Sequence, residues 1–398
     1  MVTPVHRPRI LVLTHNFPRY ENDISGIGFQ PLYRALGRYL DLHFVVPHDA
    51  GLKEFEQIGN LHVHRFRYAS DADETLAYRG EMHQRVLRQP LLAASFFQAY
   101  KDKALELTDK VFPKTVWAHW WLPGGLVGRF IAKKTDLPFV VTCHGTDIHL
   151  LKKYPWVKPL ARQVFKYARS INVVSTYLEN TLLAQIEDNS VAGKTFVAPL
   201  ISDSKNIFYD PRVRRIDGTI VSASRFTRQK NLDVLIRAVK NVVDSGIKCS
   251  LTLYGEGPEE AALRALVAEL QLPEVVKFHP PVTQEILGQR YRESDLVALV
   301  SEREGYGMTL VEAMMCGCAA IGANSGGITD IIQRPGEDGL LVEPRDVAGL
   351  TEALRRLLTD DDYRQSIAAK GRVSVSTRFS EKELTNLIVS HLLPQAKI

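Results

Sequence analysis

Short apolar runs alternate with helical stretches along this chain, and that alternation constrains its fold more than any other feature. A continuous apolar run is typical of a parallel strand whose two faces are both covered. We therefore predict an α/β fold of two Rossmann-like domains, each a doubly wound parallel sheet, with a cleft between them. The runs cover residues 9–14, 42–46, 61–66, 116–119, 138–143 and 171–175 in the first half, and 220–224, 249–254, 275–278, 296–300 and 319–322 in the second.

The two expected domains meet in a polar, irregular stretch over residues 199–209. We predict an N-terminal domain over 1–205 and a second domain over 206–378. The last segment, 379–398, is predicted to be a helix that packs back toward the first domain. Among the helices expected between strands are those over residues 26–40, 155–169 and 258–270, the last with Pro258 in its first turn.

The composition is that of an ordinary soluble protein, with 398 residues, 45% of them hydrophobic and 24% charged. No apolar run approaches the roughly 20 residues that a membrane span needs. The start, Met1 to Arg9, lacks the apolar core of a signal peptide, so a cytoplasmic protein is expected. The cysteines, Cys143, Cys249, Cys316 and Cys318, form no C-x-x-C pair, which favours reduced thiols over disulfides or zinc.

The charge is unevenly distributed along the chain. Residues 1–205 hold 26 Lys and Arg against 19 Asp and Glu, a balance of +7, and the remainder holds 24 against 26, a balance of −2. We expect an anionic partner for the first half, either a phospholipid surface or a phosphorylated acceptor, and no nucleic acid, which would call for denser basic clustering.

The predicted helix over 155–169 carries basic residues on one side and an apolar stripe on the other. Lys152, Lys153, Tyr154 and Trp156 precede it. Such a helix could touch an anionic membrane on its cytoplasmic face, or its apolar stripe could simply pack on the sheet. The pattern leaves both interpretations open.

The stretch from Ser301 to Gly327 holds the strongest candidate site. The loop after the strand over 296–300 contains Gly305 and Gly307, and acids flank it at Glu304 and Glu312. The glycines let the backbone approach a ligand, and the free N–H groups that open the next helix near Met308 suit an anion such as phosphate. The same glycines would also serve an ordinary tight turn.

Three other strand ends carry candidate binding residues. Arg225 and Lys230 follow one strand closely, and two cations fixed there can clamp a diphosphate. Gly255 follows another strand in Tyr254-Gly-Glu-Gly-Pro258. His144 ends a strand in the first half, and Asp147 is placed to cap the helix that follows it. A lone histidine at such a place is more often structural, so its assignment needs support from elsewhere.

Three further motifs of the first half are weaker. Gly26-x-Gly28 follows the first strand after a loop too long for a dinucleotide turn, which argues against NAD. Asp71-x-Asp73 could hold a metal, but its polar surroundings favour a solvated loop. The aromatic residues of the stretch 117–125 could line an acceptor cleft or belong to the core.

Together these elements resemble the retaining glycosyltransferases of the GT-B fold, specifically glycosyltransferase family 4 (glycosyl transferases group 1). The resemblance covers nearly the whole chain. Its specific motifs are R-x-x-x-x-K-N at Arg225 to Asn231, G-E-G-P at Gly255 to Pro258, E-x7-E at Glu304 to Glu312 with Gly326-Gly327 after it, and H-G-T-D at His144 to Asp147.

The resemblance implies a role for each matched residue. Arg225 and Lys230 would hold the diphosphate, Glu304 would accept hydrogen bonds from sugar hydroxyls, and Glu312 would bind the ribose. His144 would contact the sugar near the reacting carbon, and Gly28 would pass close to the diphosphate. The remaining donor-binding positions are Gly255, Glu256, His279, Val282, Gly305, Tyr306, Gly307, Met308 and Thr309. Retention is expected, with a nucleotide-diphosphate sugar as co-substrate and with no metal or other cofactor.

The predicted function is transfer of a hexose-type sugar to a hydroxyl of a lipid-linked, polysaccharide or small-molecule acceptor. A glycoside hydrolase is one alternative. If the segment between Glu304 and Glu312 were all helix, the two acids would lie about 12 Å apart, beyond the roughly 5–9.5 Å that hydrolysis needs. A partner subunit that binds sugar nucleotides without catalysis is the other alternative.

Overall fold

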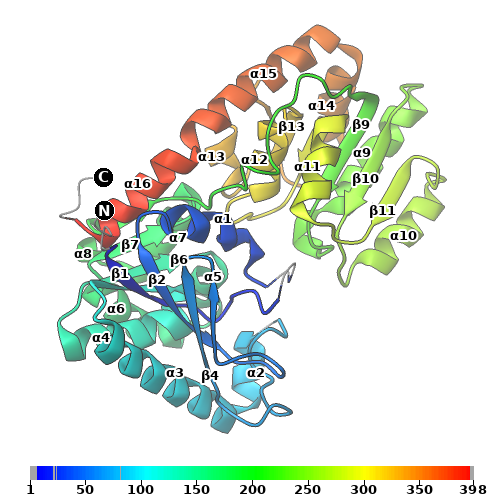
Figure 1. Ribbon diagram of the computed structural model, residues 1–398. Coiled ribbons are helices and arrows are strands. Elements are labelled where there is room, and N and C mark those ends of the chain that lie inside the picture. The colour runs from blue at the N-terminus through cyan, green and yellow to red at the C-terminus, as the bar shows by residue number, and fades with distance from the viewer. Residues whose placement is uncertain (1–6, 21–22, 24, 81, 395–398) are drawn as a thin grey trace. The chain divides into compact units, whose positions relative to one another are not determined.

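The protein is described by a computed structural model in which residues 7–20, 23, 25–80 and 82–394 are placed. The chain divides into two compact units (Figure 1). The first unit comprises residues 1–201 and 381–398, and the second comprises 202–380. Each is built around one sheet with helices between its strands, and the α/β prediction of two Rossmann-like domains is confirmed.

The first unit contains an eight-stranded sheet in the order β3-β4-β2-β1-β5-β6-β7-β8. All pairs are parallel except β3 with β4, which are antiparallel. The strands are β1 Arg9–Leu13, β2 Asp41–Pro47, β3 Phe55–Ile58, β4 Leu61–Phe66, β5 Thr115–His119, β6 Phe139–Cys143, β7 Ser170–Val173 and β8 Thr195–Val197. The helices are α1 Gln30–Leu36, α2 Met82–Arg88, α3 Pro90–Val111, α4 Leu126–Thr135, α5 Thr146–Lys153, α6 Lys158–Tyr167, α7 Thr176–Ile186, α8 Asn189–Ala192 and α16 Glu381–Leu392.

The second unit contains a six-stranded parallel sheet in the order β11-β10-β9-β12-β13-β14. Its amphipathic helix α9 buries an apolar face against α10 and α14, while α12 packs against α11 and α15. The strands are β9 Ile216–Ala223, β10 Ser250–Tyr254, β11 Val276–His279, β12 Ser294–Leu299, β13 Ala319–Ala323 and β14 Leu340–Val342. The helices are α9 Leu232–Asp244, α10 Glu260–Glu269, α11 Gln284–Glu293, α12 Met308–Met315, α13 Ile328–Ile331, α14 Val347–Thr359 and α15 Asp361–Arg378.

The last helix, α16, packs on α1 in the first unit (Figure 1). The hydroxyl of Thr115 donates to the Leu392 carbonyl at 2.6 Å, and the His391 ring stacks on Phe196 with their centroids 3.6 Å apart. Through these contacts the end of α16 is fixed to β5 and β8.

Two predicted helices, over 26–40 and 155–169, are shorter at both ends in the structure, and a 3₁₀ turn precedes each of them. Residues 27–29 form a 3₁₀ turn before α1, which begins at Gln30 and ends at Leu36. Residues 155–157 likewise form a 3₁₀ turn before α6. Pro258 precedes α10 and does not lie in its first turn, because the helix begins at Glu260.

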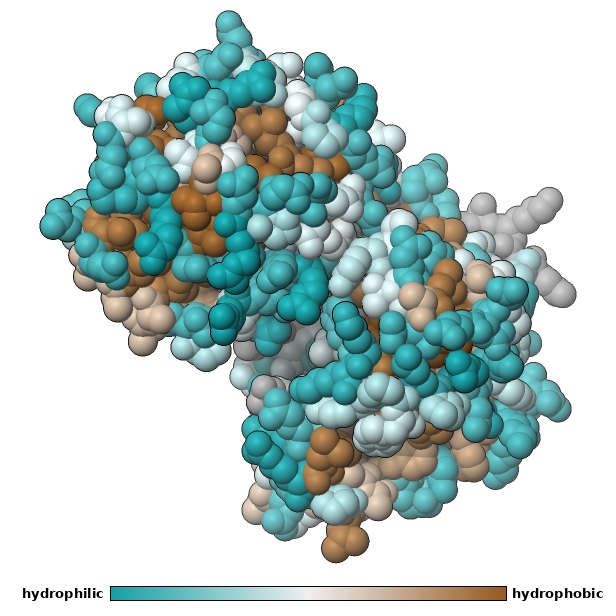
Figure 2. All heavy atoms as spheres, turned by 180° about the vertical axis from the view of Figure 1, so that it is seen from behind, coloured by the Kyte–Doolittle hydropathy of each residue, from teal (hydrophilic) through white to brown (hydrophobic). Residues whose placement is uncertain are grey.

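Sequence reasoning missed three short strands, β3, β8 and β14. None is longer than four residues, and none is fully buried, so none produces a sustained apolar run. Along the described part of the chain, no helix is both long and apolar enough to cross a bilayer. On the face drawn in Figure 2, apolar residues form separate patches divided by hydrophilic ones.

Candidate functional site

An ion pair at the ends of two neighbouring strands is the centre of the candidate site in the second unit. Lys230 lies in the loop after β9, and Glu304 lies in the loop after β12, the strand beside β9. The Lys230 Nζ donates to Glu304 Oε2 at 2.5 Å, and each side chain is less than one-fifth exposed, at 17% and 16%. The structure therefore brings together two of the predicted site residues in a largely desolvated place.

Several hydrogen bonds join the loop after β9 to the loop after β12. The Glu302 N–H donates to the Gln229 carbonyl at 2.8 Å, and the Gln229 side chain donates to the Arg303 carbonyl at 3.0 Å. The Asn231 amide donates to the Val300 carbonyl at 3.1 Å. Lys230 is thus positioned by the residues on both sides of it, while the side chain of Arg225 is exposed at the edge of the same loop.

The glycine motif at Gly255 packs directly on the loop that carries Arg225. A side-chain carbon at Gly255 would lie 1.9 Å from the Ser224 carbonyl oxygen, so only glycine fits. The Phe226 N–H donates to the Glu256 carbonyl at 2.8 Å, and the Glu256 side chain is exposed. This motif therefore shapes the Arg225 loop through its backbone.

Helix α12 begins directly after the glycine loop, as predicted. Gly307 is its N-cap with φ of 105°, and Met308 and Thr309 form its first turn. Gly326 packs against the backbone of this loop. A side-chain carbon at Gly326 would lie 2.3 Å from the Glu304 carbonyl oxygen. The neighbouring Gly327 N–H donates to that same oxygen at 2.8 Å. Glu304 and Gly305 are consequently held with their backbone pressed onto the 326–327 turn.

Tyr306 and Glu312 are buried behind this loop. The Tyr306 ring packs edge-on against Phe379, and burial raises the pKa of its hydroxyl well above the usual value. Glu312 accepts a hydrogen bond from the Gln284 amide at 2.7 Å. Burial raises the pKa of Glu312 to about 7, although the hydrogen bond from Gln284 opposes that rise. Gln284 opens α11 and was not predicted.

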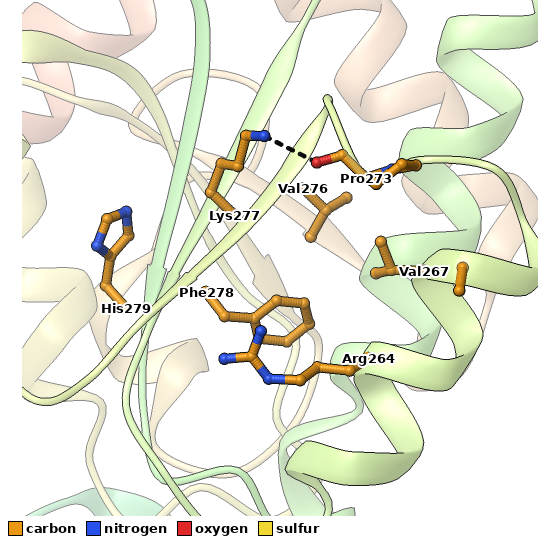
Figure 3. Close-up of a pocket in the computed structure, with 8 residues that line it drawn as sticks. Arg264, Val267, Pro273, Val276, Lys277, Phe278 and His279 are labelled. Carbon is orange, nitrogen blue, oxygen red and sulfur yellow. Dashed lines mark hydrogen bonds between the residues drawn. The ribbon is translucent and has the colours of Figure 1, made fainter.

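The residues expected beside a base lie at the end of β11. His279 is exposed and stacks on Tyr254 with their centroids 5.2 Å apart, and Val282 is half-buried in the following loop. A pocket of about 500 Å³ opens between β11 and α10 (Figure 3). Arg264 lies over the Phe278 ring there, and His279 is also among the residues that line the pocket. Neither Lys230 nor Glu304 lines this pocket, so we assign no donor group to it.

In the first unit, His144 belongs to a buried cluster of aromatic rings at the ends of β5 and β6. Its ring lies parallel to that of His119, at an angle of 4°, and the two are joined by a hydrogen bond of 2.9 Å between His144 Nε2 and His119 Nδ1. The other side of His119 contacts the Tyr33 hydroxyl at 3.3 Å. Phe29 and Trp120 pack on His144 with centroids 4.7 and 4.5 Å away.

Burial keeps this cluster uncharged at neutral pH. It lowers the pKa of His144 to about 3 and that of the neighbouring His15 to about 4, and it lowers the pKa of His119 well below the usual value. The Nδ1 of His144 is buried and makes no hydrogen bond within the described part of the chain. His144 is therefore a neutral imidazole with one nitrogen available to a ligand.

His119 is a residue that sequence reasoning missed, although it is the last residue of β5 and lies beside β6, which His144 follows. The aromatic residues around it resolve an alternative that the sequence left open. Trp117 and Trp121 are core residues with exposed fractions of 1% and 0%. Trp117 and Trp120 both lie beside His119, with ring centroids 4.4 and 6.3 Å away, and Trp120 also packs on His144.

Asp147 does not cap α5, which corrects the sequence prediction. The N-cap is Gly145, and Asp147 is the second residue of the helix. Its buried carboxylate accepts hydrogen bonds from the backbone N–H groups of His144, Gly145 and Trp121, each at 3.1 Å. Asp147 thus ties the His144 loop to the loop after β5, and burial raises the pKa of its carboxyl.

The glycine loop after β1 and the D-x-D motif complete the predicted positions. Gly26 adopts φ of 69° and packs against the Asn16 carbonyl, whereas the space in front of Gly28 is open to 4 Å. Asp71 and Asp73 lie in exposed turns, as expected, and pair with Arg67 and Ser70.

Comparisons with known proteins match both halves of the chain to one class. Residues 205–374 match the family model described as glycosyl transferases group 1, and residues 31–191 match the model described as glycosyltransferase family 4. An N-acetyl-alpha-D-glucosaminyl L-malate synthase from Bacillus anthracis is 26% identical over 296 residues, which are 72% of this chain and 76% of the relative. A D-inositol 3-phosphate glycosyltransferase from a Nocardioides species is 33% identical over 64% of this chain and 61% of its own.

Solved structures of low identity share the fold. Sucrose-phosphate synthase from Thermosynechococcus elongatus superposes with a TM-score of 0.80 at 21% identity, over 98% of this chain and 99% of its own. Anabaena HepE, solved in complex with UDP-glucose, gives 0.72 at 18% identity, over 96% and 99%. The two family models, together with the Bacillus anthracis relative, show that the chain belongs to the glycosyltransferases of family 4.

Proposed function

We propose that the protein transfers a hexose-type sugar, with retention, from a nucleotide-diphosphate sugar to an acceptor hydroxyl, and that no metal takes part. The observation that carries this proposal is the Lys230–Glu304 pair at the carboxyl ends of β9 and β12, beside the first turn of α12. A cation and a helix N-terminus at one strand end favour a diphosphate. An adjacent carboxylate can accept hydrogen bonds from sugar hydroxyls.

The cationic residues of the site act on the negative charge that develops on the diphosphate during sugar transfer. Lys230 and Arg225 offset the negative charge that grows on the departing diphosphate, which lowers the barrier for leaving. The pairing with Glu304 holds the Lys230 ammonium in one place before substrate binds, so little reorganisation is needed. Because these cations can carry out the charge stabilisation, a chelator should leave the rate of transfer unchanged.

The donor and acceptor classes are proposed from the named relatives and from the charge of the first half. Anabaena HepE was solved with UDP-glucose, so UDP-glucose is the first donor to test here. The relatives are named for malate and for inositol 3-phosphate, which are small, hydroxylated anions. The balance of +7 in the first 205 residues fits an acceptor of this kind. We therefore favour an anionic small molecule or an anionic headgroup over a neutral polysaccharide.

The test of the site is the loss of turnover in variants of the central pair. Lys230→Ala and Glu304→Ala should each lower kcat/KM by at least about 100-fold, because the diphosphate loses a fixed charge or the sugar loses an acceptor. Turnover is measured as release of nucleoside diphosphate in the presence of acceptor, first with UDP-glucose and then with other nucleotide sugars.

Lys240→Ala is the matched control for that test. Lys240 also pairs with an acid, Asp244, in the same unit, but the pair lies on the exposed side of α9. Its loss should leave kcat/KM unchanged. Near-normal activity of both Lys230→Ala and Glu304→Ala, with thermal stability retained, would contradict the site assignment.

Two alternatives are distinguished by the same assay. A hydrolase would release free sugar without acceptor, and a non-catalytic partner subunit would bind nucleotide without turnover. Residues 304–307 form a loop and α12 begins only at Met308, so the all-helix estimate of the distance between Glu304 and Glu312 does not apply. The ion pair and membership of a glycosyltransferase family support transfer over both alternatives.

A contact with an anionic membrane surface remains part of this proposal. Trp156 is 70% exposed beside the exposed Lys152 and Lys153, whereas the apolar stripe of α6 packs inward. Trp156→Ala combined with Lys152→Ala and Lys153→Ala should weaken sedimentation with anionic liposomes. Lys133→Ala with Lys134→Ala, at the end of α4, is the control. Liposome binding that survives the triple variant would exclude this surface.

A further inference from the structure

A row of histidines lies on one face of the first sheet, at the end remote from the candidate site of that unit. Asp41 and His43 lie two residues apart on β2, and His62 and His64 lie two apart on β4, so all four point to one face. In the parallel register His43 is directly opposite His62. Asp41 is the first residue of its strand, whereas His144 follows the last residue of β6.

The Asp41 carboxylate bridges the two facing imidazoles. Its Oδ1 lies 2.9 Å from His62 Nε2, and its Oδ2 lies 3.4 Å from His43 Nε2. The two rings stack nearly parallel, with centroids 4.4 Å apart. One ligand atom from each of these three residues thus lies within 4.8 Å of the others.

The Nε2 of His43 is buried and lies 3.4 Å from the Asp41 carboxylate, and among the described residues it has no partner that meets hydrogen-bond geometry. Its other nitrogen, Nδ1, contacts His64 Nε2 at 3.3 Å. If His43 donates its Nδ1 proton to His64, a lone pair is left on the Nε2 that faces Asp41 and His62. Histidines that bind metals are commonly oriented by such a second hydrogen bond on the far side of the ring.

We propose that Asp41, His43 and His62 form a binding site for a divalent transition-metal ion of the zinc type. Two imidazoles and a carboxylate are ligands that zinc, nickel and cobalt accept. Bonds of about 2.0–2.1 Å in a tetrahedral arrangement require ligand atoms roughly 3.3–3.4 Å apart, and modest side-chain rotations reach that spacing. The fourth position is open to water, since Asp41 and His62 are about one-quarter exposed, at 28% and 24%.

The surroundings set the strength of this site. Arg9 Nε lies 3.7 Å from Asp41 Oδ2 and competes with a bound cation. Lys103 and Glu106 of α3 lie on the His64 side and form an ion pair of 3.1 Å with each other. Burial lowers the pKa of His43, and it lowers that of His64 to about 4.

The test is zinc binding by the full chain after treatment with a chelator and buffer exchange. Calorimetric titration with Zn²⁺ alone at neutral pH should show one ion per chain. His43→Ala and His62→Ala should abolish this binding. His64→Ala, which removes only the orienting partner, should weaken it about 10-fold to 100-fold. Asp41→Asn, which preserves size, should also abolish binding while the thermal stability without metal is retained.

Two controls separate this site from other ligands in the chain. His83→Ala removes a histidine of α2 outside the row, and Cys249→Ser removes the one cysteine that is not fully buried. Both should bind Zn²⁺ as the parent does, and the Co²⁺ complex should lack a thiolate-to-metal charge-transfer band. No binding by the parent chain, or equal binding by His43→Ala and His62→Ala, would overturn the proposal.

Discussion

At the scale of single residues, Glu312 is a group of the candidate site whose charge changes near neutral pH. Burial raises its pKa to about 7, so a substantial fraction is protonated under ordinary assay conditions. The proposed role, accepting hydrogen bonds from both ribose hydroxyls, is best served by the carboxylate form, in which both oxygens are acceptors. A nucleotide that binds only this form must displace the proton.

Nucleotide affinity should therefore fall as the pH falls through about 7. Below its pKa the loss approaches tenfold per pH unit, because each unit is 1.36 kcal/mol of differential binding. Calorimetric titration with UDP across this range measures it. Glu312→Gln, which cannot ionise, should bind more weakly than the ionised parent but with a flat profile. An equally steep profile in that variant would contradict the assignment.

His119 is expected to position the His144 ring and not to contact the substrate itself. We expect its Nδ1–H to donate to His144 Nε2, which fixes the His144 ring and leaves Nδ1–H of His144 for the sugar. His119→Ala should lower kcat about tenfold, the effect of roughly 1.4 kcal/mol from a lost orienting hydrogen bond.

His119→Asn separates positioning from packing. The asparagine amide can replace the Nδ1–H donor, so this variant should recover kcat while His119→Ala does not. Tyr33→Phe should give a smaller loss in kcat, since it removes only the outer contact of 3.3 Å. Equal losses in the Asn and Ala variants would assign a merely structural role to His119.

At the scale of elements, most of the candidate site could be predicted because it lies where strands end. Lys230, Glu304 and His144 each follow a buried apolar run, and the carboxyl ends of parallel strands meet at one edge of a sheet. What could not be predicted depends on tertiary contacts. The hydrogen bond from Gln284 to Glu312 joins residues 28 positions apart, and Asp147 binds the Trp121 N–H from 26 positions away. Nothing in the local pattern of either residue specifies its partner.

The loop before α12 illustrates an element held by its backbone. Gly326 has φ of 62° and leaves no room for a side chain beside the Glu304 carbonyl. Gly326→Ala should displace Glu304, lower kcat/KM by at least about tenfold and cost roughly 1–3 kcal/mol of folding free energy. Activity and urea unfolding measure the two effects.

Gly336→Ala provides the matched comparison in the same unit. Its φ of 89° is also left-handed, but the nearest atom to an added carbon is 3.9 Å away. It should cost stability of a similar order without loss of kcat/KM. Loss of activity in both variants would show that strain, and not displacement of Glu304, is responsible.

At the scale of the whole molecule, the two units should respond oppositely to acid. In the histidine cluster of the first unit, burial lowers the pKa of His15 to about 4 and that of His144 to about 3, and it lowers the pKa of His119 well below the usual value. The unfolded chain therefore binds more protons than the folded one as the pH falls below about 6.5, and the first unit loses stability. Glu312 in the second unit has a raised pKa and contributes stability below about 4.5 that is lost as the pH rises through about 7.

Tryptophan fluorescence can follow the first unit alone, because the chain's 4 tryptophans, at positions 117, 120, 121 and 156, all lie within it. The urea midpoint measured by fluorescence should fall as the pH is lowered from about 6.5 toward 5. The free energy of unfolding should fall by up to about 1.4 kcal/mol per pH unit for each histidine of this cluster. Circular dichroism, which reports both units, should then separate into two transitions. His144→Asn removes one group that takes up a proton on unfolding. The urea midpoint measured by fluorescence should therefore depend less steeply on pH in this variant. A midpoint independent of pH in this range would show that these histidines are not buried as neutral groups.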